Sequence, residues 1–175
     1  MVEAALAWMG LVELVGRGGA VLLVIMAITF VMWALIVERL WYLKSGHVGD
    51  AEEVAMVWAA RSDRRSWSAQ QIRYALISQL ANKLNRSLGM IASLVAICPL
   101  LGLLGTVTGM IEVFDVVAMT GLGNTRAMAA GVSKATVPTV AGMVAALSGY
   151  YFSVRLRRTA ASEIQSFADR LTTET

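Results

Sequence analysis

The chain has 175 residues, of which 57% are hydrophobic, and its mean hydropathy is +0.64. Soluble domains average roughly 45–50% apolar residues, so this composition fits an integral membrane protein better than a soluble domain. The formal net charge is only +3 and no nucleic-acid-binding motif accompanies it, so no nucleic-acid partner is expected. The lone cysteine, Cys98, cannot form an internal disulfide, and the length predicts a single domain over residues 1–175.

Residues 3–16 have the apolar spacing of an amphipathic helix. Two interpretations stay open for this segment. It lies on the outer membrane interface, or it begins the first membrane span and is broken by Gly16, Gly18 and Gly19. The segment carries Glu3 and Glu13 instead of a basic region, so we expect no cleavable signal peptide and expect the first span to be retained.

Three uncharged stretches raise the hydropathy, at Gly18–Val37, Ser87–Ile111 and Ala135–Val154. A helix of about 20 apolar residues crosses the hydrocarbon core of a bilayer. None of the three stretches contains an Asp, Glu or His. We therefore predict an all-α integral membrane protein with three transmembrane helices, at about 19–38, 87–111 and 135–154.

Positive charge is distributed unevenly between the segments that connect these spans. Of the 15 Lys and Arg residues, eight lie between the first two spans, four follow the last span and three lie elsewhere. Cytoplasmic segments of membrane proteins carry an excess of Lys and Arg. This pattern predicts a cytoplasmic loop at 39–86, an outer loop at 112–134 and a cytoplasmic C-terminal helix at 155–171, with the N-terminus outside.

Two amphipathic patterns extend beyond the spans. Before the second span, apolar residues recur every four positions, at Ile72, Leu76, Leu80 and Leu84. We predict one unbroken helix from about Trp67 through the second span, because no break signal separates them. After the last span, apolar or small residues recur every three or four positions, at Leu156, Ala160, Ile164, Phe167 and Leu171. These long helical extensions are expected to pack on each other and on copies of the chain.

The second and third spans carry small residues and prolines at helix-packing spacing, at Pro99, Gly102, Gly105, Gly109, Pro138, Gly142 and Ala146. The same region of each helix holds a threonine, Thr106 in the second span and Thr139 in the third. Two interpretations stay open. The hydroxyls bond to backbone carbonyls within a packed interface, or they line a polar seam or pore.

The spans hold no group that could carry a proton by itself. Proton relays in membranes use Asp, Glu or His, whereas a threonine hydroxyl does not titrate in the useful range. If protons cross this membrane domain, a second subunit must therefore supply the carboxylate.

Glu112 and Lys134 lie at the outer ends of the second and third spans. Lys134 either extends its ammonium group to the interface or pairs with Glu112 or with a partner carboxylate. The sequence contains no metal-ligand cluster, no nucleophile–base set and no phosphate loop, so we expect no enzyme activity, metal or cofactor.

Three motifs resemble the MotA/TolQ/ExbB family of proton-channel subunits, and most of all its ExbB branch. They are Glu38–Leu40, Pro99–Gly109 and Gly131–Ala146, and the resemblance covers about residues 20–170. It implies a protein of the bacterial inner membrane with the N-terminus in the periplasm and the C-terminus in the cytoplasm. It also implies a homopentamer around two ExbD-like single-span partners, whose aspartate carries the proton. A TonB-like protein would pass the energy of the proton-motive force to outer-membrane uptake of iron chelates and cobalamin.

The resemblance also implies roles for single residues. Thr106 and Thr139 would face the pore beside the partner's aspartate. Lys134 is a departure, because many ExbB and TolQ proteins have a glutamate there, and it would set partner register or exclude cations at the outer mouth. Two alternative functions stay open: a TolQ-like role in envelope integrity, and a passive membrane scaffold in which the threonines only pack.

Overall fold

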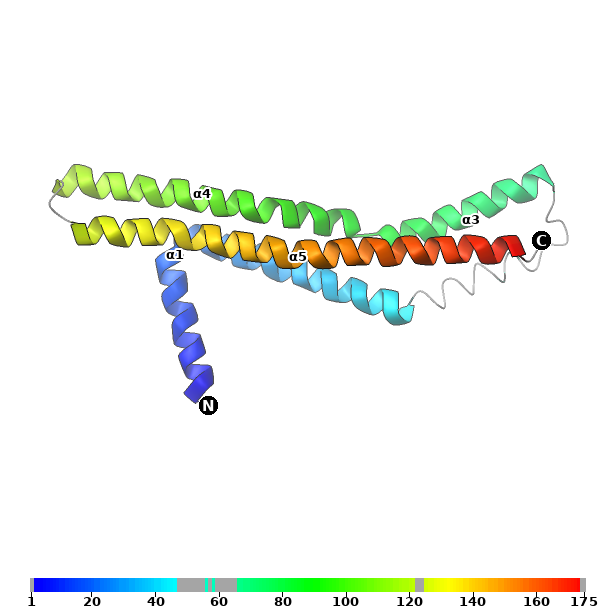
Figure 1. Ribbon diagram of the computed structural model, residues 1–175, viewed down its shortest axis with the longest axis horizontal. Coiled ribbons are helices and arrows are strands. Elements are labelled where there is room, and N and C mark those ends of the chain that lie inside the picture. The colour runs from blue at the N-terminus through cyan, green and yellow to red at the C-terminus, as the bar shows by residue number, and fades with distance from the viewer. Residues whose placement is uncertain (1, 47–55, 57, 59–65, 122–124, 174–175) are drawn as a thin grey trace. The chain divides into compact units, whose positions relative to one another are not determined.

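A computed structural model describes residues 2–46, 56, 58, 66–121 and 125–173. All regular elements among the described residues are helical (Figure 1). They are α1 at Val2–Trp41, a π-helical turn η1 at Tyr42–Gly46, α3 at Trp67–Asn85, α4 at Leu88–Thr120 and α5 at Thr125–Thr173. The predicted all-α class is therefore confirmed.

Three described segments are long and apolar enough to cross a membrane, at Gly19–Lys44, Trp67–Met119 and Met128–Leu171. The second and third contain the corresponding uncharged stretches, and the first contains all of its stretch except Gly18. Many large apolar side chains on them are exposed, for example Phe30 at 75% and Leu147 at 68%. Such exposure suits helices whose surroundings are lipid or other helices instead of water.

The chain divides into two compact units. The first contains Met1–Trp33 and Ser93–Tyr150. In this unit α4 and α5 run side by side (Figure 1). Glycines bring the helices together: Gly131 of α5 lies against Val113 of α4, and Gly149 of α5 lies against Val95 of α4 and Met32 of α1.

Helix α1 is kinked at Gly19, so its N-terminal part leaves the axis of the rest of the helix (Figure 1). Gly19 has φ 64° and ψ −167°, a conformation that glycine adopts without a steric penalty because it has no Cβ. Of the glycines that predicted a break, this is the one at which the backbone leaves helical geometry. The location of residues 3–16 at the membrane interface stays a prediction.

The second unit contains Ala34–Ala92 and Tyr151–Thr175. Its core includes Leu80 and Leu84 from α3, and the predicted stripe of α5, in which Leu156, Ala160, Phe167 and Leu171 are buried. The Arg73 guanidinium of α3 donates a hydrogen bond of 2.9 Å to the Ala168 carbonyl of α5. The prediction that these two extensions pack on each other is therefore confirmed.

The prediction of one unbroken helix from Trp67 through the second span is wrong. Helix α3 ends at Asn85 and α4 begins at Leu88, and between them Ser87 has a positive φ of 66°. The Ile91 amide donates to the Ser87 carbonyl at 2.9 Å, which starts the new helix.

A side chain from elsewhere in the sequence contacts the break. The Arg39 guanidinium donates to the Lys83 carbonyl at 3.4 Å and to Ser87 Oγ at 3.3 Å. The carbonyls of a helix's last turn lack intrahelical partners, so Arg39 stabilises the end of α3. No local sequence pattern reveals this contact.

Candidate functional site

A line of small residues holds α4 and α5 together, and we call it the small-residue seam. It comprises Gly102, Gly105 and Gly109 of α4 and Ala135, Pro138, Thr139 and Gly142 of α5. A Cβ placed on Gly109 would lie 2.5 Å from the Ala135 Cα, and one on Gly105 would overlap the Pro138 ring. A Cβ on Gly142 would lie 2.5 Å from the Cys98 carbonyl oxygen. The glycines therefore permit backbone contact that no larger residue allows.

The two remaining predicted packing residues lie near this seam. Ala146 is buried in a cluster with Cys98 and Ala145, and Ile28 of α1 packs against it. Pro99 is half-buried within α4. A proline has no backbone N–H to donate. The Val95 carbonyl therefore receives no helical hydrogen bond from Pro99, and the Lys134 carbonyl receives none from Pro138.

Thr139 joins the two helices of the seam through its side chain. Its Oγ1 donates a hydrogen bond of 2.7 Å to the Gly102 carbonyl of α4. This is the hydrogen bond to a backbone carbonyl that the packing interpretation of Thr139 predicted. A hydroxyl that donates one bond keeps two acceptor lone pairs, so the half-buried Thr139 oxygen can still accept a hydrogen bond from a partner.

Thr106 is bonded differently. Its Oγ1 donates to the Leu103 carbonyl of its own helix at 2.7 Å, and its side chain is partly exposed. The neighbouring Thr108 hydroxyl lies 3.1 Å from both the Leu104 and Gly105 carbonyls. The two predicted pore threonines thus donate to carbonyls of the same helix, α4, one within that helix and one from across the seam.

Glu112 and Lys134 are brought together at one end of the seam. Lys134 Nζ donates to Glu112 Oε2 at 2.5 Å, and the two side chains are 35% and 54% exposed. Of the alternatives for Lys134, the structure contains the pair with Glu112. A small cavity of about 150 Å³ beside the pair is also lined by Gly19, Thr108 and Gly109.

Gly19, at the kink of α1, lies close to the Lys134 side chain. A Cβ placed on Gly19 would lie 3.3 Å from Lys134 Cε. Gly19 therefore serves two needs, a positive φ and close approach to the Lys134 side chain. The sequence indicated the helix break but not this proximity, because the two residues are far apart in the chain.

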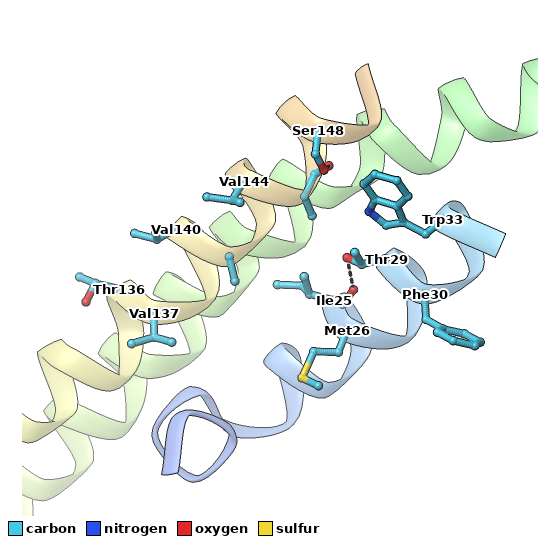
Figure 2. A pocket seen from close by; sticks show the side chains of 12 residues that line it. Ile25, Met26, Thr29, Phe30, Trp33, Thr136, Val137, Val140, Val144 and Ser148 are labelled. Carbon is cyan, nitrogen blue, oxygen red and sulfur yellow. Dashed lines mark hydrogen bonds between the residues drawn. The ribbon is translucent and has the colours of Figure 1, made fainter. Parts of the chain in front are cut away.

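An apolar groove lies between α1 and α5 in the first unit (Figure 2). Its volume is about 950 Å³, and Figure 2 shows Phe30, Trp33 and Met26 of α1 opposite Val140 and Val144 of α5. The hydroxyls at its wall bond within their own helices, Thr29 to the Ile25 carbonyl at 2.7 Å and Ser148 to the Ala145 carbonyl at 2.8 Å. No sequence pattern predicted this groove, because it forms between segments that are distant in the chain.

The described residues contain no group of three or more His, Cys, Asp or Glu side chains that could hold a metal ion. The chemistry within reach of the seam is therefore that of hydroxyls, backbone carbonyls and one exposed ion pair.

Comparison with known proteins places this arrangement in a family. The model of the MotA/TolQ/ExbB proton channel family matches residues 51–169. A relative from Helicobacter pylori strain 26695, named as an ExbB-like biopolymer transport protein, is 28% identical over 109 residues, which are 62% of this chain and 58% of the relative. The biopolymer transport protein ExbB of Aquifex aeolicus is 33% identical over 81 residues, which are 45% of this chain and 55% of that protein. The chain thus spans just over half the length of these curated relatives. Since the family match covers more than half of the chain, this protein belongs to the MotA/TolQ/ExbB proton channel family.

Proposed function

We propose that this chain is the stator and channel subunit of an ExbB–ExbD–TonB-type complex in a bacterial inner membrane. The complex uses the proton-motive force to energise outer-membrane uptake of iron chelates and cobalamin. Membership of a proton channel family supports the use of protons. The names of the relatives, which refer to ExbB and to biopolymer transport, support the transport role.

The observation that carries the proposal is a missing carboxylate. Three uncharged stretches of this chain suit membrane spans, yet none contains an Asp, Glu or His. A proton path through the membrane needs such a group. We therefore infer a partner with a single transmembrane helix of the ExbD type, whose aspartate carries the proton beside this chain.

The proposed assembly is a homopentamer that surrounds two ExbD-like helices. The exposed apolar side chains of α4 and α5, among them Leu100, Leu103, Met143 and Leu147, supply surface for helix–helix contact within the bilayer. In the proposed assembly, copies of the chain and lipid cover these exposed faces.

In this assembly Thr139 and Thr106 line the proton path. A threonine hydroxyl solvates an aspartate in both of its protonation states, because it both donates and accepts hydrogen bonds. Thr139 is the stronger candidate, since its bond to the Gly102 carbonyl fixes the orientation of its oxygen between two helices. The proton-motive force supplies about 2.3 kcal/mol per charge per 100 mV, so a few protons provide work on the scale of breaking a modest interface.

Lys134 and Glu112 form the outer mouth of the path. The excess of Lys and Arg in 39–86 and after the last span supports a cytoplasmic location for those segments and a periplasmic location for the N-terminus. The Lys134–Glu112 pair then faces the periplasm. In that position the lysine sets the register of the partner helix or lowers the local concentration of cations.

The proposal is tested by replacing Thr139 in the complete complex. Thr139→Val keeps the size and branching of the side chain but removes the hydroxyl, while the matched control Thr139→Ser keeps the hydroxyl. We expect proton flux into proteoliposomes to fall about tenfold or more in the valine variant, the scale of one lost hydrogen bond. The serine variant should retain most of the flux.

A passive membrane scaffold is the second candidate, because both threonine hydroxyls already have backbone partners. A scaffold predicts that Thr106→Ala and Thr139→Ala preserve function wherever assembly survives. Assembly without proton flux supports the channel, and assembly with undiminished flux or function supports the scaffold. Loss of an ExbB-type function impairs growth under iron starvation. Loss of a TolQ-type function makes the cells sensitive to detergent.

A further inference from the structure

A basic pocket lies at the end of α1 in the second unit. Its volume is about 250 Å³, and it is lined by Glu38, Arg39, Tyr42, Lys83 and Arg86. Three of these five side chains are cationic and one is anionic. The pocket therefore has an excess of positive charge, and neither the small-residue seam nor the proposed proton path uses it.

Arg39 is the most unusual member of this pocket. Only 3% of its surface is exposed, and its guanidinium stacks over the Tyr42 ring with 5.2 Å between the Cζ atom and the ring centroid. Its two terminal nitrogens make long hydrogen bonds, of 3.4 Å to the Lys83 carbonyl and 3.3 Å to Ser87 Oγ.

The Nε of Arg39 has no hydrogen-bond partner among the residues that the structure describes. A buried charge with an unsatisfied donor is unfavourable unless a counter-charge reaches it. The guanidinium groups of Arg39 and Arg86 match the geometry of phosphate oxygens, to which arginine binds through two parallel hydrogen bonds.

The surroundings of the pocket favour a lipid as the source of such an anion. The uncharged stretch of the first span ends at Val37, directly before the pocket residues Glu38 and Arg39. On the same last turns of α1, Val37 is 54% exposed and Trp41 is 74% exposed. An exposed tryptophan at the end of a span is typical of headgroup level, so apolar surface for an acyl chain lies next to the cationic pocket.

We propose that this pocket binds the phosphodiester of an anionic membrane phospholipid, with Arg39 and Arg86 as the phosphate ligands and Val37 and Trp41 beside the acyl chain. Basic pockets between transmembrane helices on the cytoplasmic side bind anionic headgroups in this way. The lipid would join the end of α1 to the end of α3, where Lys83 and Arg86 lie. This inference does not depend on the proposed proton path.

Native mass spectrometry of the full chain, in its assembly and in mild detergent, tests the proposal. We expect delipidated protein to bind added phosphatidylglycerol in preference to phosphatidylcholine. Arg86→Gln should weaken that binding about tenfold, the effect of one lost charge-assisted hydrogen bond. Arg86 is exposed, so the variant should fold. The matched control is Arg158→Gln, since Arg158 is an exposed arginine of α5 that does not line the pocket.

One further arm separates a lipid from a soluble source of the phosphate group, and a second variant tests the role of Arg39. If inorganic phosphate binds with the affinity seen for phosphatidylglycerol, the pocket is a site for a soluble anion, and the lipid proposal is overturned. Arg39→Lys keeps the charge and removes Nε, so it should also weaken binding of phosphatidylglycerol. Equal binding by the Arg86→Gln and Arg158→Gln variants, or no preference for the anionic lipid, overturns the proposal.

Discussion

At Gly109 the backbone of α4 approaches α5 so closely that a single methyl group has no space. The Ala135 Cα and Cβ would both lie 2.5 Å from an added Cβ, and the Ala135 nitrogen would lie 2.9 Å away. Gly102 and Gly105 are close to α5 in the same manner, at Thr139 and Pro138. These three residues fix the distance between the helices that hold the two candidate pore threonines.

Gly109→Ala is expected to destabilise the protein by about 1–3 kcal/mol, because the methyl group must displace the backbone of α5. Gly89→Ala is the matched control in the same helix, since nothing lies within 4 Å of its added Cβ. The control should be neutral or slightly stabilising, because alanine favours helix over glycine. Thermal unfolding in detergent measures both, and equal midpoints for the two variants would contradict close packing at Gly109.

The Lys134–Glu112 pair contributes little to stability despite its short distance of 2.5 Å. Its side chains are 35% and 54% exposed, and exposed ion pairs stabilise proteins by about 0–1 kcal/mol. The pair places one positive and one negative group side by side at one end of the seam.

Lys134→Glu is expected to lower the midpoint of thermal unfolding by a few degrees at low salt, because two carboxylates then face each other. The double variant Lys134→Glu with Glu112→Lys should restore the midpoint, and high salt should reduce the difference. If salt does not change the lowered midpoint of Lys134→Glu and the double variant does not restore it, the Lys134 side chain acts through packing instead of charge.

Two helix breaks show what the sequence reveals about elements and what it conceals. The kink of α1 occurs at Gly19, one of the glycines that predicted it, because a positive φ is a local property of glycine. The break between α3 and α4 occurs at Ser87, which also has a positive φ although it is not a glycine. The Arg39 guanidinium from the end of α1 donates to Ser87 Oγ at this break, a contact that no local pattern encodes.

Ser87→Val is expected to destabilise the α3–α4 junction by about 1–3 kcal/mol. A β-branched residue is strained at positive φ, and the acceptor for Arg39 is lost. Ser87→Asn is the matched control, because asparagine tolerates this conformation and keeps an acceptor oxygen. Hydrogen exchange at the end of α3 measures the effect. Identical protection in both variants would show that the Arg39–Ser87 contact does not stabilise the break.

The spans and the stripes were predictable because they are periodic or uninterrupted in sequence. Charge-free stretches predicted the three helices that are long and apolar enough to cross a membrane, and a spacing of three or four residues predicted the buried Leu156 and Phe167 of α5. The small-residue spacing predicted close packing but not its register. The register depends on how the two helices align, which only the structure shows. In this alignment Gly109 faces Ala135, and the Gly102 carbonyl accepts a hydrogen bond from Thr139.

At the scale of the whole molecule, this chain has the features of one component of a larger membrane assembly. Its spans expose large apolar side chains, and α1 and α5 form an open apolar groove lined by Phe30 and Val144 (Figure 2). This chain belongs to a proton channel family and has no carboxylate in its uncharged stretches, which is why we propose that another chain supplies one. Both features favour assembly with copies of itself and with an acidic single-span partner.

Native mass spectrometry of the tagged full chain, co-expressed with an ExbD-like single-span protein, tests this assembly directly. We expect a complex of five copies of this chain with two copies of the partner. We further expect that replacing the partner's membrane aspartate with asparagine preserves the complex but abolishes proton flux in proteoliposomes. A stable homo-oligomer that never captures the acidic partner would leave the membrane domain without a proton carrier and would contradict the proposed stator function.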